Sequence, residues 1–307
     1  MTDGLRGRRA LRIVQVSDTH LSRTHGYFYD NWTVFLDALA SERPDRLIHT
    51  GDVTFNGPIS SDDIAFGRAE LDRTELSWNA VAGNHDIGEA PAFSRLAQPI
   101  DDTRIARWRR HMGELWWSFD FGEWRLVGLD TALMASERPE EREQAAFLRE
   151  ALNTRGRRPV MVFMHMPPFD RDREDDAFTT AAIPYPARGT FLETCAAGGV
   201  KVIACGHLHV YRRLRHRGME IVWAPSTAMM NVEHQLRNRR RFPRPGYLVW
   251  EFDGRRVRHS LVEPPLMPVI DVTGWTTRNG GTTTTMPPKP LHGRAGSTAR
   301  PALTTMD

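Results

Sequence analysis

Five short apolar runs in this chain of 307 residues each end directly in a motif of aspartate, asparagine or histidine. The runs and their motifs are Leu11–Ser17 before DTH, Arg46–Thr50 before GD, Ser77–Ala82 before GNHD, Pro159–Met164 before His165, and Val200–Cys205 before GHLH. Amphipathic segments of helical period lie between the runs, and strands that alternate with helices predict βαβ units. Hairpins, such as Tyr247–Phe252 with Val257–Val262, are mixed among these units. The pattern therefore predicts an α/β fold whose sheets are mixed rather than purely parallel.

The polar residues after these strands form one set of candidate metal ligands. In open α/β sheets the carboxyl ends of the strands gather along one edge, where ligands bind, so the set should converge on one pocket. Its members are Asp18, His20, Asp52, Asn84, His165, His207 and His209, all of them oxygen or nitrogen donors. Seven donors exceed the three or four protein ligands of a single zinc ion. They suit two divalent transition-metal ions about 3.5–4 Å apart that share one bridging carboxylate.

The five motifs, in this order, resemble those of the calcineurin-like metallophosphoesterase superfamily. The resemblance spans about Arg12–Val210 and departs from none of the motif positions. It implies a four-layer α/β/β/α sandwich with two mixed sheets, and a metal-dependent phosphoric ester hydrolase. The spacing and the GDVTFNGP context are most similar to the branch that holds class III cyclic nucleotide phosphodiesterases and glycerophosphodiesterases.

The resemblance also implies roles for the candidate residues. Asp18, His20, Asp52 and His209 would hold one metal ion, and Asp52, Asn84, His165 and His207 the second, with Asp52 bridging. His85 corresponds to the family's catalytic histidine, and Asp86 would orient it by accepting its other ring proton. The two divalent ions would be Mn, Fe or Zn. A hydroxide that bridges them would attack phosphorus in line, while the ions and His85 stabilise the charge developing on the oxygens.

Four residues outside the set of metal ligands are candidates for binding the substrate. The loop after the first motif carries Tyr27, Phe28 and Tyr29 at the edge of the predicted pocket, where aromatic rings could stack on a base or an aryl group. Alternatively, these rings only anchor the loop. Asn56 follows the GD motif closely enough to reach a substrate oxygen. The arginines of 237–244 could clamp a second phosphate, although a solvated basic loop is the simpler interpretation.

Hydrolysis of a phosphodiester is the predicted reaction. The branch resemblance points to it, and an aromatic loop offers an apolar surface to a second ester group. A phosphomonoesterase or a nuclease that uses the same site is the alternative. A non-catalytic scaffold of the same fold is a further alternative, but such scaffolds have typically lost ligands or the catalytic histidine, and this chain keeps all of them.

Composition sets the expectations for partners and location. The formal net charge is +3, of which 264–307 carries +2, and a near-neutral body argues against dedicated nucleic-acid binding. No stretch approaches 18 apolar residues, and the first residues lack the apolar run of a signal peptide. The chain has only two cysteines, so we expect no disulfide framework. We expect a cytoplasmic enzyme with a small phosphoester substrate and no membrane partner, and we leave a homodimer open.

Residues 1–263 are predicted to form the catalytic domain, and 264–307 a tail. The tail contains ten threonines, seven prolines and five glycines. A segment of this composition buries too little apolar surface to offset the entropy lost on ordering, so we predict it to be mostly disordered. Truncation after Val262 or Glu263 is therefore expected to leave a folded and active enzyme.

Overall fold

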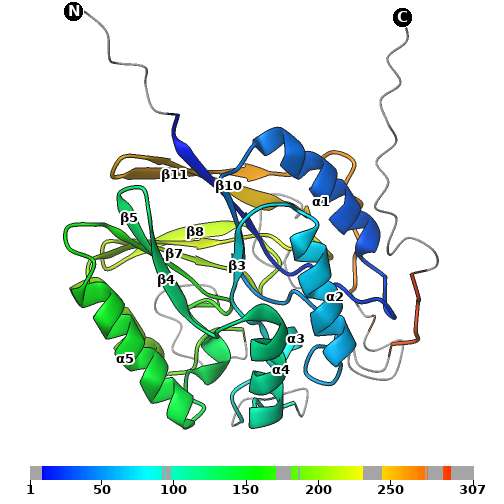
Figure 1. Ribbon diagram of the computed structural model, residues 1–307, viewed down its shortest axis with the longest axis horizontal. Helices are drawn as coiled ribbons and strands as arrows, with labels where there is room; N and C mark the ends of the chain where they lie inside the picture. Colours follow the sequence, from blue (N-terminus) through cyan, green and yellow to red (C-terminus); the bar gives the residue numbers. More distant parts are fainter. Residues whose placement is uncertain are drawn as a thin grey trace, which may run out of the picture.

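The computed structural model describes residues 9–91, 94, 98–170, 181–185, 187–230, 244–273, 275 and 286–291. Two β-sheets stack face to face, and helices cover their outer faces (Figure 1). This arrangement is the predicted four-layer α/β/β/α sandwich, and both sheets are mixed. The prediction of the fold class is therefore confirmed.

The first sheet has five strands in the order β11-β10-β1-β2-β3. They are β1 (Leu11–Val16), β2 (Arg46–His49), β3 (Trp78–Ala80), β10 (Tyr247–Asp253) and β11 (Arg256–Val262). β1, β2 and β3 run parallel, whereas β10 pairs antiparallel with both β1 and β11. The predicted closing hairpin thus adds two antiparallel strands to one edge of a parallel core.

The second sheet has six strands in the order β4-β5-β6-β7-β9-β8. They are β4 (Trp117–Phe121), β5 (Trp124–Gly128), β6 (Val160–Phe163), β7 (Val200–Cys205), β8 (Arg212–His216) and β9 (Met219–Trp223). The four inner strands run parallel, and β4 and β8 lie antiparallel at the two edges. All four residues of β6 are buried, as expected for a central parallel strand covered on both faces.

Helices on the two outer faces complete the core. The first sheet packs against α1 (Tyr29–Glu42) and α2 (Ser61–Asp72), with α4 (Asp102–Met112) beside α2. The second sheet packs against α5 (Pro139–Asn153) and α6 (Ala187–Ala197). Two short elements, α3 (Asn84–Ile87) and the 3-10 helix η2 (Thr131–Leu133), follow strands β3 and β5. Among the described residues, no helix is long and apolar enough to cross a membrane.

Parts of the segment predicted as a tail lie against the body. Met267 and Met286 are buried, with 2% and 5% of their surface exposed. Residues 286–291 run beside the loop after β1 (Figure 1, red). Much of the rest of 264–307 lies outside the described residues, so the boundary at 263 and the disorder remain predictions.

Candidate metal centre

The loops that follow β1, β2 and β7 are tied to one another by hydrogen bonds. The backbone N–H of Asp18 donates to the Gly51 carbonyl at 3.0 Å, and that of His20 to the Asp52 carbonyl at 3.1 Å. The backbone N–H of His207 donates to Asp18 Oδ2 at 3.1 Å. Together with the loops after β3 and β6, they bring all seven predicted donors to one place.

Five of these donors have a left-handed backbone, which is costly for any residue with a Cβ. Their φ angles are 53° at Asp18, 45° at His20, 53° at Asp52, 70° at His207 and 54° at His209. Each such residue costs about 1–2 kcal/mol. Backbone strain of this kind clusters at functional sites, where the surrounding structure imposes it.

Two glycines let the loops approach the ligands closely. A Cβ at Gly83 would lie 2.2 Å from Asp52 Oδ1, and one at Gly206 would lie 2.6 Å from Asp18 Oδ2. Both distances are far inside van der Waals contact. Larger residues at these two positions would therefore displace the carboxylates.

Four side chains form the first group of potential ligands. Asp18, His20, Asp52 and His209 each offer one ligand atom, and these atoms lie within 4.8 Å of one another. His209 Nε2 is 3.3 Å from Asp18 Oδ1, and His20 Nε2 is 3.7 Å from Asp52 Oδ2. The two Nε2 atoms approach each other to 3.4 Å. Imidazole nitrogens and carboxylate oxygens that converge in this way suit a divalent transition-metal ion.

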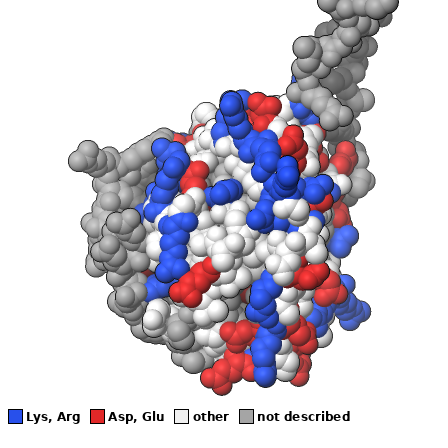
Figure 2. All heavy atoms as spheres, turned by 90° about the vertical axis from the view of Figure 1, so that its left-hand side faces the viewer, with Lys and Arg blue, Asp and Glu red and all other residues white. Residues whose placement is uncertain are grey.

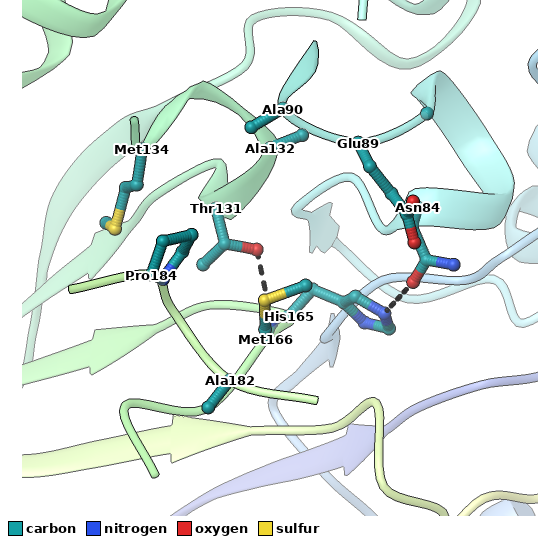
Figure 3. Close-up of a pocket in the computed structure, with 11 residues that line it drawn as sticks. Asn84, Glu89, Ala90, Thr131, Ala132, Met134, His165, Met166, Ala182 and Pro184 are labelled. Carbon is teal, nitrogen blue, oxygen red and sulfur yellow. Dashed lines mark hydrogen bonds between the residues drawn. The ribbon is translucent and has the colours of Figure 1, made fainter. Parts of the chain in front are cut away.

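A second group adjoins the first and shares Asp52 with it. Asp52, His165 and His207 meet the same 4.8 Å limit. His165 Nε2 lies 3.4 Å from Asp52 Oδ1 and 3.1 Å from His207 Nδ1. It also lies 3.1 Å from Asn84 Oδ1 (Figure 3). The two oxygens of Asp52 thus face different groups, Oδ2 the first and Oδ1 the second. This is the placement that a bridging carboxylate requires.

The two carboxylates stay ionised although they are buried. Burial alone would raise the pKa of Asp18, but the facing His209 lowers it to about 2. Burial also works against ionisation of Asp52, yet His165 and His85 hold its pKa well below the usual value. Burial would lower the pKa of His165, and the charge of Asp52 instead raises it to about 10. The site therefore stabilises positive charge between these side chains.

The residues present fit divalent metal ions on two further grounds. Asp18 Oδ1 and His20 Nδ1 are buried and have no hydrogen-bond partner among the described residues. An unpaired buried polar atom costs about 1–3 kcal/mol, a cost that a bound cation can remove at the carboxylate. The donor set also contains only oxygen and nitrogen, the ligands that Mn, Fe and Zn accept in catalytic sites.

The structure corrects the role predicted for Asp86. The ring of His85 is oriented by a backbone carbonyl instead, since its Nδ1 lies 3.0 Å from the Phe55 oxygen. The Asp86 carboxylate accepts hydrogen bonds from the backbone N–H of Gly83 at 2.8 Å and of Thr54 at 2.9 Å. It therefore fastens the loop after β2 to the start of α3 and does not contact the imidazole. The prediction failed because spacing in the sequence does not reveal which neighbour a carboxylate turns toward.

Comparison with known proteins identifies the family. Residues 11–211 match the model of the calcineurin-like phosphoesterase family. The chain belongs to this family. The matched range contains all seven donors and His85, and a hydrolase with a metal site is what the family implies.

Solved structures share the fold of this family member at low sequence identity. A dimetal phosphatase from Danio rerio is 15% identical with a TM-score of 0.55, and the match covers 83% of this chain and 98% of the other. GAP50, the anchor in the inner membrane complex of Plasmodium, is 16% identical with a TM-score of 0.59, covering 86% and 87%. A purple acid phosphatase from yellow lupin is 14% identical with a TM-score of 0.56, covering 85% and 53%. At these identities the likeness shows the fold alone. No curated protein matches the chain in sequence.

His49 supports the metal-site loops of this phosphoesterase, and sequence reasoning missed it. Its ring is fully buried at the end of β2. Its Nδ1 accepts a hydrogen bond from the Gly51 N–H at 3.2 Å, and its Nε2 lies 2.9 Å from Thr19 Oγ1. The Thr19 hydroxyl donates to the Val53 carbonyl, so it accepts from His49. One imidazole thus holds the loop of Asp18 and the loop of Asp52 together.

Two of the aromatic residues predicted near the substrate anchor their loop instead. Phe28 and Tyr29 are 1% and 5% exposed. The Tyr29 hydroxyl donates to Glu70 on α2, so the structure does not bring this residue to the metal groups. The Phe28 ring lies 6.3 Å from the His20 ring and stacks on Trp275. Of the two interpretations that the sequence left open, these placements favour anchoring for both residues.

Of the other two predicted substrate residues, Tyr27 lies nearer the surface and Asn56 lies in the loop after β2. Tyr27 is half-buried, and its hydroxyl donates to the Pro287 carbonyl. Asn56 is 5% exposed, and its backbone N–H donates to Asp63 at 3.0 Å. A role in substrate binding remains a prediction for both. The arginines 237–241 lie outside the described residues.

A small hollow opens beside the second group of ligands (Figure 3). Asn84 and His165 line one side of it, and Ala132, Met134 and Pro184 line another. Its volume of about 20 Å³ gives room for one water molecule. The described residues that line it include neither arginine nor lysine.

Proposed function

We propose that the protein hydrolyses phosphoesters with two divalent metal ions held by the seven donors, and that phosphodiesters are its preferred substrates. The observation that carries this proposal is the position of Asp52, whose two oxygens face different ligand groups. A shared carboxylate suits two ions at the separation used in phosphoryl transfer, about 3.5–4 Å. Bound there, such ions would polarise the phosphoryl oxygens and lower the pKa of water.

The chain's own residues contribute charge and proton transfer. Two divalent ions would bring four positive charges, and Asp18 and Asp52 return two negative ones, so the site would attract a phosphate anion. A carbonyl oxygen only accepts hydrogen bonds, so the contact with Phe55 places a hydrogen on His85 Nδ1. The proton that His85 gains or loses is therefore the one on Nε2. We propose that His85 Nε2 donates this proton to the ester oxygen that leaves.

A preference for diesters is supported by what surrounds the ligands. A phosphomonoester presents additional charged oxygens, which a monoesterase would meet with cationic side chains outside the metal set. The described residues that line the hollow beside Asn84 and His165 supply no such cation. The half-buried ring of Tyr27, in the loop after the first motif, is our candidate for the surface that a second ester group would contact.

A small substrate is supported over nucleic acid by the charge distribution. A nuclease of this size would need a basic track for the phosphate backbone. On the face shown in Figure 2, acidic side chains lie among the basic ones. Ion pairs such as Arg125–Asp120 at 2.5 Å and Arg12–Glu251 at 2.6 Å offset the charge of individual arginines.

A comparison of model esters tests the proposal. The purified protein, loaded with manganese, is assayed at neutral pH with bis-(p-nitrophenyl) phosphate and with p-nitrophenyl phosphate, and Asp52→Ala serves as the matched control. We expect a larger kcat/KM for the diester and no turnover by the control. A clear preference for the monoester would reassign the protein as a phosphatase, and two bound ions without turnover of either ester would favour a scaffold. Cyclic nucleotides and glycerophosphodiesters are the substrates to assay next, because the motifs resemble those of enzymes that act on them.

A further inference from the structure

Residues 286–291 run alongside the loop that follows the first metal-binding motif and bind it through their backbone. Lys289 pairs with His25 as a parallel β-bridge. The Gly26 N–H donates to the Lys289 carbonyl at 2.9 Å, and the Leu291 N–H to the Arg23 carbonyl at 3.0 Å. A Cβ at Gly26 would lie 2.3 Å from Leu291 Cδ2, so the glycine allows this close approach.

The same segment closes a small hydrophobic cluster. Phe28, Phe55, Ala228, Met229 and Met286 form this closing cluster, and Tyr27, Ile270, Val272 and Trp275 pack against it. Met286 is 5% exposed. Residues 270–272 are fixed by two backbone hydrogen bonds of 2.9 Å with Met230. Ile270, Val272, Trp275 and Met286 therefore supply one wall of the cluster, and the loops of the body supply the other.

Three members of the closing cluster touch the candidate metal site. The Phe28 ring lies edge-on to the His20 ring, with centroids 6.3 Å apart. The Phe55 carbonyl holds His85 Nδ1 at 3.0 Å. The Ala228 N–H donates to the Asp18 carbonyl at 3.2 Å. The cluster thus lies directly behind two ligands of the first group and behind the residue proposed to donate the proton.

We propose that residues 270–272, 275 and 286–291 form a positioning element of the active site, which holds the first ligand group and His85 in place through the closing cluster. Without Met286 the rings of Phe28 and Phe55 would lose their cover, and surface loops that lose apolar contacts repack or open locally. The family match ends at residue 211, so this element belongs to this chain rather than to the matched pattern. It also leads to the opposite expectation for truncation after Val262, which would remove this positioning element. The inference rests on the proposed function only for its effect on turnover, because metal binding can be measured independently.

Full-length variants test the inference. Met286→Asp places a charge in the closing cluster. Leu266→Asp makes a similar change at a residue that is 83% exposed and lies outside the cluster, and Met286→Leu keeps the apolar volume. The readouts are manganese affinity, the number of ions per chain, kcat and KM with the diester, and the melting temperature.

We expect Met286→Asp to weaken manganese binding or lower kcat by roughly 10- to 100-fold, the usual cost of losing support behind metal ligands. KM should change less than kcat, the cooperative unfolding of the body should persist, and Leu266→Asp and Met286→Leu should behave like the parent. Unchanged metal affinity and kcat in Met286→Asp would overturn the inference. Loss of cooperative folding would also overturn it, because the segment would then support the whole core. A parent protein that binds metal but hydrolyses no ester would refute the proposed function alone, and the metal titration would still decide this inference.

Discussion

Replacing His49 by alanine should destabilise the fold and loosen the metal site together. The buried ring accepts a hydrogen bond from Gly51 and donates one to Thr19. Its removal leaves the buried Gly51 N–H unpaired, which costs about 1–3 kcal/mol, and deletes the Thr19 bond, worth about 0.5–1.5 kcal/mol. The free energy of unfolding should therefore fall by about 1.5–4.5 kcal/mol. Manganese affinity should fall roughly 10- to 100-fold, because Thr19 stands between Asp18 and His20.

Urea unfolding and manganese titration of three variants measure the two effects. His49→Asn keeps an acceptor near the position of Nδ1, and His49→Gln keeps a donor near that of Nε2. Each should recover part of the stability that His49→Ala loses. His49→Asn should report on the contact with Gly51, and His49→Gln on the contact with Thr19. A loss below about 0.5 kcal/mol in His49→Ala, with unchanged metal affinity, would refute the supporting role.

The pH dependence of stability gives a second test of the same residue. Burial lowers the pKa of His49 from 6.5 to about 3, so the ring is neutral in the folded protein near neutral pH. Between these values the unfolded chain binds a proton that the folded chain does not, so stability is lost as the pH falls below 6.5. This residue should cost about 1.4 kcal/mol at pH 5.5 relative to pH above 7.5. His49→Gln should lack that contribution, and equal slopes for the two proteins would show that the ring is not held neutral.

Three substitutions test the other assignments. Asp52→Ala should remove at least one ion per chain and abolish turnover, since its carboxylate faces both groups; elemental analysis that still finds two ions would contradict bridging. His85→Ala should keep the metal content and lower kcat roughly 10²- to 10⁴-fold, with a smaller loss for esters of good leaving groups. Asp86→Ala should instead lower the free energy of unfolding by about 3 kcal/mol in urea titrations, because it orphans the N–H groups of Gly83 and Thr54. A loss of kcat confined to poor leaving groups would restore the orienting role for Asp86.

The sequence predicted the fold and the convergence of the donors because both follow from strand periodicity. A strand such as β6 is apolar throughout since both of its faces are buried, and the residue after it must lie at the carboxyl edge of the sheet. The hairpin was also predictable from the sequence, since the predicted strands Tyr247–Phe252 and Val257–Val262 lie within β10 and β11 of the structure.

Three features could not be predicted because they depend on tertiary contacts. The carboxylate of Asp86 had two neighbours within reach, His85 and the loop after β2, and only the folded structure decides between them. His49 occupies a buried strand position that many residue types fill, so nothing marks it as a link between loops. Residues 286–291 bind through backbone hydrogen bonds and through a few apolar side chains such as Met286, and neither feature stands out in the composition of 264–307.

The metal site is maintained by the loops as a unit rather than by its ligands alone. Five left-handed ligand residues together cost about 5–10 kcal/mol, which is comparable to the entire net stability of an ordinary domain. The compensation comes from groups that never face a metal, namely the backbone bonds between the loops of Asp18 and Asp52, the His49 ring beneath them and the closing cluster behind them. Because strain at the ligands is opposed by contacts elsewhere, a substitution at His49 or Met286 changes the ligand geometry without touching a ligand. The chemistry of this site therefore depends on its supporting residues as well as on the donors themselves.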